Sequence, residues 1–141
     1  MDVKNKAEDF FWMMLNSKRN LAEIPQSCSQ GETGVLVYLA FFQDKITPSE
    51  LSVALKVSMP RIISVLNSLE SKNLIIKNID NDDKRKTIVV ITKKGKEYID
   101  EKKEEAIEHI SRVMEKLEES EIEEYIRLTK KILGIINKIQ D

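Results

Sequence analysis

The feature that most constrains the fold is a pair of short apolar runs on either side of a charged linker. The runs cover residues 74–79 and 87–91 and are rich in isoleucine and valine, which favour β-strands. The linker, residues 80–86, places Lys84, Arg85 and Lys86 after two aspartates. Two strands joined by a polar linker predict a β-hairpin, and this one would carry concentrated positive charge at its turn.

Two short helices are predicted immediately before the hairpin. Thr47-Pro48-Ser49-Glu50 has the form of a capping box, with proline at the first helical position. The next helix would have Ser58 as its N-cap and Pro60 in its first turn, and would end near Asn73, which tolerates the left-handed conformation. Its buried stripe would consist of Ile62, Val65, Leu66 and Leu69. A capped helix, a tight turn, a second helix and a hairpin are the order of a helix-turn-helix with a wing.

Four further amphipathic helices are predicted around this segment. They cover residues 2–23, residues 32–43, a stretch from Thr92 to about Leu117, and a last helix that begins at a second capping box, Ser120-Glu121-Ile122-Glu123. The expected fold class is therefore mainly α (α+β).

The charge of the chain is distributed unevenly. The net charge is −1, yet residues 45–95 hold 10 Lys and Arg against 5 Asp and Glu, while the rest holds 13 against 19. The middle of the chain is therefore basic between acidic flanks, a distribution that predicts a surface facing a polyanion. The second helix would point Met59, Arg61, Ser64, Asn67 and Ser68 away from its buried stripe. Arg, Ser and Asn are side chains that bond base edges and phosphates, and the helix N-terminus at Ser58–Arg61 favours a phosphate.

Three pieces of this segment carry a resemblance: TPSELS (47–52), LNSLESKNLI (66–75) and DNDDKRKTIVVITKKG (80–95). Together they resemble the MarR family of bacterial transcription regulators. The family's wing reads Asp-Arg-Arg and then a β run ending in Leu-Thr-x-x-Gly, which here become Asp83-Lys84-Arg85 and Ile91-Thr92-Lys93-Lys94-Gly95. Asn73 stands where the family usually has glycine, and Lys84 replaces an arginine, so it lacks the two-pronged guanidinium.

The resemblance implies a ligand-responsive homodimeric repressor that binds a pseudo-palindromic operator in double-stranded DNA. The recognition helix would lie in the major groove and the wing in the minor groove, where Arg85, oriented by Asp83, would exploit the concentrated negative potential. The expected DNA-binding residues are Ser58, Met59, Pro60, Arg61, Ser64, Asn67, Ser68, Lys84, Arg85 and Lys86.

The terminal helices carry more apolar surface than a thin arm could bury, so we expect them to pair with a second subunit. Phe11, Ile132, Ile136 and Ile139 are the candidate interface residues. Residues 1–31 and 96–141 would form this helical dimerisation region, and residues 32–95 the winged helix-turn-helix domain. Relatives in the family often bind an aromatic or lipophilic effector, for which Phe10, Met14, Tyr38 and Phe42 are candidate wall residues, although core packing explains each of them as well.

The sequence fits several other functions less well. A winged-helix protein-interaction module without DNA binding is the main alternative, and the basic middle argues against it. An enzyme is not expected, because the sequence shows no nucleophile–base pair, no paired carboxylates in an apolar setting and no phosphate-binding glycine loop.

Cys28 lacks basic neighbours that would make it an oxidant sensor, and His109 with Glu105 and Glu108 is a poor zinc set. No metal and no cofactor are expected. The apolar FFWMML at 10–15 is too short to span a membrane, so we expect a cytoplasmic protein.

Overall fold

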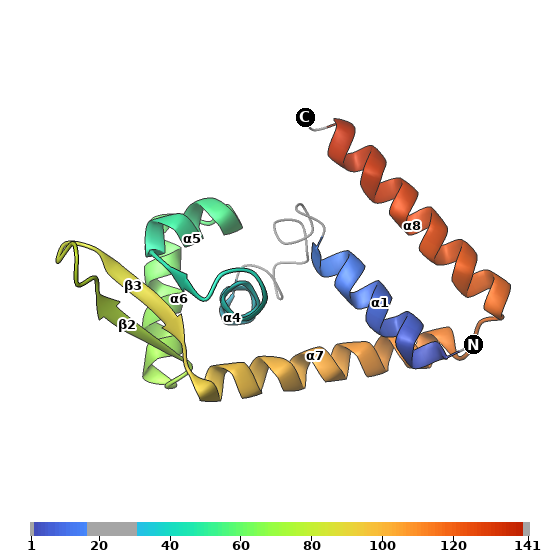
Figure 1. Cartoon of the computed structure of the whole chain (residues 1–141), viewed down its shortest axis with the longest axis horizontal. Coiled ribbons are helices and arrows are strands. Elements are labelled where there is room, and N and C mark those ends of the chain that lie inside the picture. Colours follow the sequence, from blue (N-terminus) through green and yellow to red (C-terminus); the bar gives the residue numbers. More distant parts are fainter. Residues whose placement is uncertain (1, 17–30, 140–141) are drawn as a thin grey trace. The chain divides into compact units, whose positions relative to one another are not determined.

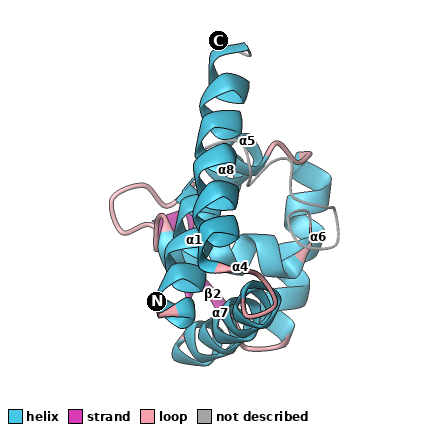
Figure 2. Cartoon of the chain, turned by 90° about the vertical axis from the view of Figure 1, so that its right-hand side faces the viewer, coloured by secondary structure: helices cyan, strands magenta, loops and turns pink. Residues whose placement is uncertain are grey.

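The computed structural model describes residues 2–16 and 31–139 of the chain (Figure 1). The chain divides into two compact units, one of Met1–Asn20 with Lys102–Asp141 and one of Leu21–Glu101. Helices dominate the described residues, and the strands are confined to one small sheet (Figure 2). The mainly helical winged fold predicted from the sequence is confirmed.

The unit of residues 21–101 contains the predicted helix-turn-helix and wing. Its elements are α4 (Glu32–Phe41), β1 (Lys45–Ile46), α5 (Pro48–Leu55), α6 (Met59–Ser71), β2 (Ile75–Ile79) and β3 (Thr87–Ile91), followed by the start of α7 (Lys93–Met114). In Figure 1 the β2–β3 hairpin extends beside α6, and α5 lies across the other end of α6. The order of elements that was expected of residues 47–95 is therefore the order observed.

Side-chain caps set the helix starts in this unit. The Thr47 hydroxyl accepts from the Glu50 backbone N–H at 3.2 Å, the Ser58 hydroxyl accepts from Arg61 N–H at 3.4 Å, and the Thr92 hydroxyl accepts from Gly95 N–H at 3.0 Å. Each bond satisfies a backbone donor that has no partner within the helix. The caps predicted at Thr47 and Ser58 are confirmed, and the helix predicted to start at Thr92 is capped by that residue.

Two residues with left-handed backbone end the short helices. Lys56 closes α5 at φ 55°, and Asn73 follows α6 at φ 62°. Asparagine adopts this conformation more easily than most residues with a Cβ atom. The interpretation of Asn73 as the terminator of the recognition helix is therefore confirmed.

The sheet is antiparallel, with strand order β1-β3-β2. In the wing, Ile75 pairs with Ile91 and Ile79 pairs with Thr87, so the strands differ from the predicted runs by one residue at most. The two-residue strand β1 pairs with the opposite edge of β3. It was not predicted, because two residues carry no periodic pattern and become a strand only through this long-range pairing.

One apolar core joins α4, α5, α6, the sheet and the start of α7. Its most deeply buried side chains include Leu36, Leu39, Leu51, Ile62, Leu66, Leu69, Ile75, Val89 and Ile99. Three of the four residues in the predicted stripe of α6 are fully buried, and Val65 is partly buried against the same core. This packing fixes which face of α6 remains outside.

The other unit consists of α1 (Val3–Asn16), the later part of α7 and α8 (Glu119–Ile139). Ala7, Ile107, Met114 and Ile122 form its small buried core. At its edge the Phe10 and Tyr125 ring centroids lie 5.3 Å apart. The Trp12 indole packs edge-on against Phe11 at 5.4 Å and lies under the Lys103 ammonium at 5.6 Å.

Helix boundaries in this unit differ in part from the predicted ones. The first helix is described to Asn16, and residues 17–23 of the predicted stretch lie outside the described residues. The prediction that Ser120 caps the last helix is wrong. The helix begins at Glu119, and the Glu118 N–H donates to the Glu121 carboxylate at 2.9 Å. A glutamate reaching back to the N-cap N–H makes one of the two bonds of a capping box, two residues earlier than the serine would have done.

Candidate nucleic-acid interface

The outer face of α6 is polar and open to solvent. Arg61, Ser64 and Asn67 are exposed on it, and Met59 is partly exposed. Ser58 and Pro60 lie at the exposed start of the helix, where Ser58 is the cap. Because the opposite face is held in the core, these side chains are presented together on one surface of a rigid helix.

Ser68 lies at the border of this surface rather than on it. It is half-buried, and its hydroxyl donates to the carboxylate of Glu32 on α4. The same carboxylate accepts from Lys72 Nζ at 2.6 Å. The hydrogen bond from Lys72, followed by that from Ser68, lowers the pKa of Glu32. The Ser68 hydroxyl is therefore used to bind α6 to α4.

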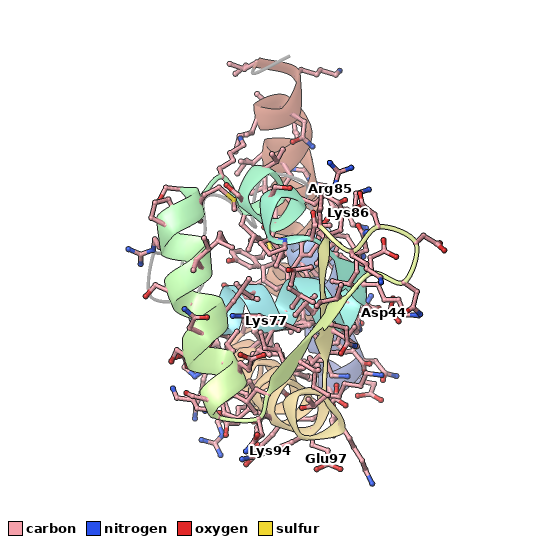
Figure 3. The ribbon with its side chains drawn as sticks, turned by 90° about the vertical axis from the view of Figure 1, so that its left-hand side faces the viewer. Asp44, Lys77, Arg85, Lys86, Lys94 and Glu97 are labelled. Atoms are coloured by element: carbon pink, nitrogen blue, oxygen red, sulfur yellow. The ribbon has the colours of Figure 1, made fainter. Side chains whose placement is uncertain are left out.

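The wing turn displays its cations outward. Arg85 has a side chain that is 93% exposed, and its Nε lies 3.4 Å from Asp83 Oδ1. The same aspartate oxygen accepts from the Arg85 backbone N–H at 3.0 Å, which confirms Asp83 as an orienting partner for Arg85. Lys84 and Lys86 are also exposed, and neither has an acidic partner within 4.0 Å among the described residues. Figure 3 shows Arg85 and Lys86 near the turn of the hairpin.

Backbone bonds hold the turn in shape. The Asp80 N–H donates to the Lys86 carbonyl at 2.9 Å, and the Lys86 N–H donates to the Asp83 carbonyl at 2.9 Å. The Asp80 carboxylate in turn accepts from the Asp82 N–H at 2.9 Å. The linker is thus a hydrogen-bonded turn, so its cations are held at a defined end of the wing.

The sequence does not predict one contact between the wing and the recognition helix. Lys77 on β2 donates through Nζ to the Asn67 side-chain oxygen on α6 and lies 3.8 Å from the Glu70 carboxylate. Lys77 is directed inward, since it pairs with the buried Val89 on the core side of the hairpin. Figure 3 shows Lys77 between β2 and α6. The one available signal was its place in the strand alternation, which puts it on the same face as Ile75.

The end of α6 is fastened to the start of α7. The Thr92 hydroxyl donates to the Asn73 carbonyl at 2.7 Å, and Lys94 Nζ donates to the Lys72 carbonyl at 3.1 Å. A Cβ atom on Gly95 would lie 2.2 Å from the Leu74 carbonyl oxygen. The Thr-x-x-Gly sequence therefore allows a close approach of α7 to the strand that leaves the recognition helix.

Comparison with known protein families matches residues 32–110 to the winged helix DNA-binding domain. The chain belongs to this winged helix family. The match includes the whole of α4, α5, α6 and the sheet, together with most of α7. Comparison with curated proteins gave no match.

Several solved structures of similar fold are transcription regulators. MepR of Staphylococcus aureus, a transcription regulator of the multidrug efflux pump MepA, is 22% identical over 90% of this chain and 95% of its own, with a TM-score of 0.67. FabT of Streptococcus pneumoniae, solved in complex with DNA, is 20% identical over 93% and 92%, with a TM-score of 0.66. A mutant form of MarR from E. coli is 25% identical over 89% and 95%, with a TM-score of 0.60. The resemblance to MarR-type regulators is confirmed, and these relatives are regulators rather than enzymes.

The candidate effector residues of this winged helix protein fall in both units. Phe10, half-buried, packs against Tyr125 in one unit, and Met14 is half-buried in the same unit. In the other unit the Tyr38 and Phe42 rings stack with centroids 5.6 Å apart. Phe42 and Lys96 also line an open hollow of about 420 Å³. A pocket shared by all four candidate residues stays a prediction.

The candidate dimer residues lie mostly on α8. Ile132 is 53% exposed and Ile139 is 76% exposed, while Ile136 and, on α1, Phe11 are partly buried. Tyr125, Leu128 and Ile135 add to the exposed apolar surface of this helix. Such a surface on a helix that also carries many charges is typical of a protein–protein contact.

Other candidates from the sequence have little structural support. Cys28 lies outside the described residues. Glu108, next to His109, forms an ion pair with Arg112 at 2.8 Å. Within residues 2–16 and 31–139, no three potential ligands gather where a metal ion could be held. Among the described helices, none is both long enough and apolar enough to cross a membrane.

Proposed function

We propose that this winged helix protein is a sequence-specific, double-stranded DNA-binding transcription regulator. The observation that carries the proposal is the polar face of α6, presented from the same unit as a hydrogen-bonded wing turn with three exposed cations. Such cations bind phosphates, and base readout needs donors and acceptors on a helix that fits the major groove. FabT, a regulator of similar fold, is solved in complex with DNA, which supports the same mode for this chain.

In the proposed complex α6 enters the major groove and the wing follows the backbone into the adjacent minor groove. Arg61, Ser64 and Asn67 face the base edges, and the N-terminus of α6 at Ser58 binds a phosphate. Arg85 enters the minor groove, where its charge meets concentrated negative potential, and Lys84 and Lys86 bind phosphates on either side. Ser68 contributes indirectly, because its hydroxyl is bound to Glu32.

The proposed functional state is a homodimer on a pseudo-palindromic operator. Residues 1–31 and 96–141 form its dimerisation region, and the exposed isoleucines of α8 supply apolar contact between subunits. Two recognition helices related by a two-fold axis read two half-sites about one helical turn apart. We further propose that the protein is a cytoplasmic repressor, which leaves DNA when it binds a small lipophilic or aromatic ligand. Tyr38 and Phe42 form part of the wall of this ligand site.

Selection of bound duplexes from a randomised pool tests this function. The proposal expects the pool to converge on a sequence with two inverted half-sites, bound with an affinity that falls steeply with salt because condensed counterions are released. The free protein should sediment as a dimer at the concentration used for binding. A pool that stays random would refute DNA readout and favour a winged-helix protein-interaction module instead.

A further inference from the structure

Lys77 fixes the orientation of an amide on the recognition helix. Its Nζ donates to the Asn67 side-chain oxygen and lies 3.8 Å from Glu70 Oε1. An ammonium group can only donate hydrogen bonds. The amide oxygen of Asn67, and not its nitrogen, must therefore face Lys77, whichever way the amide would otherwise turn.

The remaining hydrogen-bonding capacity of Asn67 then lies mainly in its Nδ2 donor group, because the second lone pair of its oxygen lies beside the Lys77 ammonium. Its Nδ2 carries two hydrogens and, among the described residues, donates to no protein oxygen. Asn67 is exposed, one turn along α6 from the exposed Ser64, so the amide lies on the outer face of the helix. The neighbouring ammonium group adds only donors at the oxygen end of the amide, and the Glu70 carboxylate lies beside that ammonium as its ion-pair partner.

We infer that Asn67, positioned by Lys77, determines specificity by reading guanine in the major groove; this rests on the proposed DNA-binding function. An unpaired asparagine reads adenine through both ends of its amide, accepting from N6 and donating to N7. Here the accepting end is occupied by a charged donor, and the adenine amino group would meet a cation. Guanine offers only acceptors, N7 and O6, at the same edge. It therefore matches what the Asn67–Lys77 pair presents.

Duplex selection with three variants tests the assignment. The wild-type protein should select guanine at one position of each half-site. Asn67→Ala should lose the preference at that position and keep it at the others. Lys77→Met frees the amide oxygen and should change the preferred base there from guanine to adenine. Lys45→Met removes another exposed lysine of the same unit and should leave every position unchanged.

An altered operator gives a second readout that does not depend on the folding of Lys77→Met. A guanine analogue that lacks N7, placed at the selected position, should weaken wild-type binding about tenfold and leave Asn67→Ala binding unchanged. Equal losses in both proteins, or a wild-type preference for adenine at the position that Asn67 controls, would overturn the inference while the proposed function stands. A wild-type protein that selects no sequence would overturn both.

Discussion

Lys72 Nζ lies 2.6 Å from the Glu32 carboxylate, which joins the C-cap residue of α6 to the first residue of α4. Ser68 donates to the same carboxylate from one turn earlier on α6. The recognition helix is thus held along its rear edge by one acidic group, while its outer face stays exposed.

The cluster of Glu32, Lys72 and Ser68 should make the free energy of unfolding depend on pH. The hydrogen bond from Lys72, and then that from Ser68, lower the pKa of Glu32 in the folded protein. The stabilisation is therefore fully present above the unfolded-state pKa and is lost as pH falls through the folded-state pKa. Since the Lys72 and Glu32 side chains are both partly exposed, we expect Glu32→Gln to lower the free energy of unfolding by only about 0.5–1 kcal/mol near neutral pH. Urea unfolding at neutral and acidic pH measures the difference in free energy of unfolding between wild type and Glu32→Gln, which should vanish in acid.

A matched variant separates this effect from general acid denaturation. Glu123→Gln removes an exposed glutamate of α8 outside the cluster and should not change the pH dependence. A difference between Glu32→Gln and wild type that persists in acid would contradict the charge-based account.

Gly95→Ala should destabilise the fold by about 1–3 kcal/mol, as expected where added atoms meet a packed site. The new Cβ atom would lie 2.2 Å from the Leu74 carbonyl oxygen, which is backbone and cannot turn away. Thermal unfolding measures the loss. Gly134→Ala is the control, because nothing lies within 4 Å of its Cβ position on α8 and alanine favours the helix by about 0.5–1 kcal/mol. Loss of stability in both variants would disprove the steric explanation.

Arg85→Ala should lower operator affinity about tenfold and leave thermal stability unchanged. The side chain is 93% exposed and its ion pair is with Asp83, two residues away, so little folding energy is lost. Fluorescence anisotropy with a labelled operator measures the affinity. Lys116→Ala, which removes an exposed cation from the other unit, should bind as wild type does. Unchanged affinity in Arg85→Ala would remove the wing from the proposed interface.

Ile132→Asp should weaken self-association at least about tenfold, because a buried charge in an apolar contact is costly. Ile132 is 53% exposed in the single chain, so the subunit itself should still fold. Sedimentation at several concentrations measures the dissociation constant, and circular dichroism verifies helix content. Lys130→Asp, at an exposed polar position of the same helix, is the control. A dissociation constant of Ile132→Asp equal to that of the wild type would exclude this face of α8 from the dimer interface.

Local features of this chain were predictable from sequence because their physics is local. Thr47, Ser58 and Thr92 cap helices through bonds that reach three residues ahead, and Asp83 binds Arg85 two residues away. The hairpin was also predictable, since both of its strands are apolar and lie close together in the sequence.

Features that depend on distant partners were not predictable. Ser68 looks like a groove-facing residue on a helical wheel, yet its hydrogen-bond acceptor, Glu32, lies 36 residues away. Lys77 looks like an ordinary strand lysine, and its role comes from Asn67 on another element. The predicted cap of α8 was wrong for a different reason. Several acidic residues in a row allow more than one start of the helix, and the bond from the Glu118 N–H to the Glu121 carboxylate places that start at Glu119.

The contact between Trp12 and Lys103 has a spectroscopic consequence. Trp12 is the single tryptophan of the chain, and its indole lies against Phe11 and a cation in the unit that holds α1 and α8. Its intrinsic fluorescence therefore reports on that unit alone, without a label and without tryptophan emission from the helix-turn-helix and wing. Changes in emission on dilution would follow events at the terminal helices, while an operator-borne dye follows the recognition helix in the same cuvette.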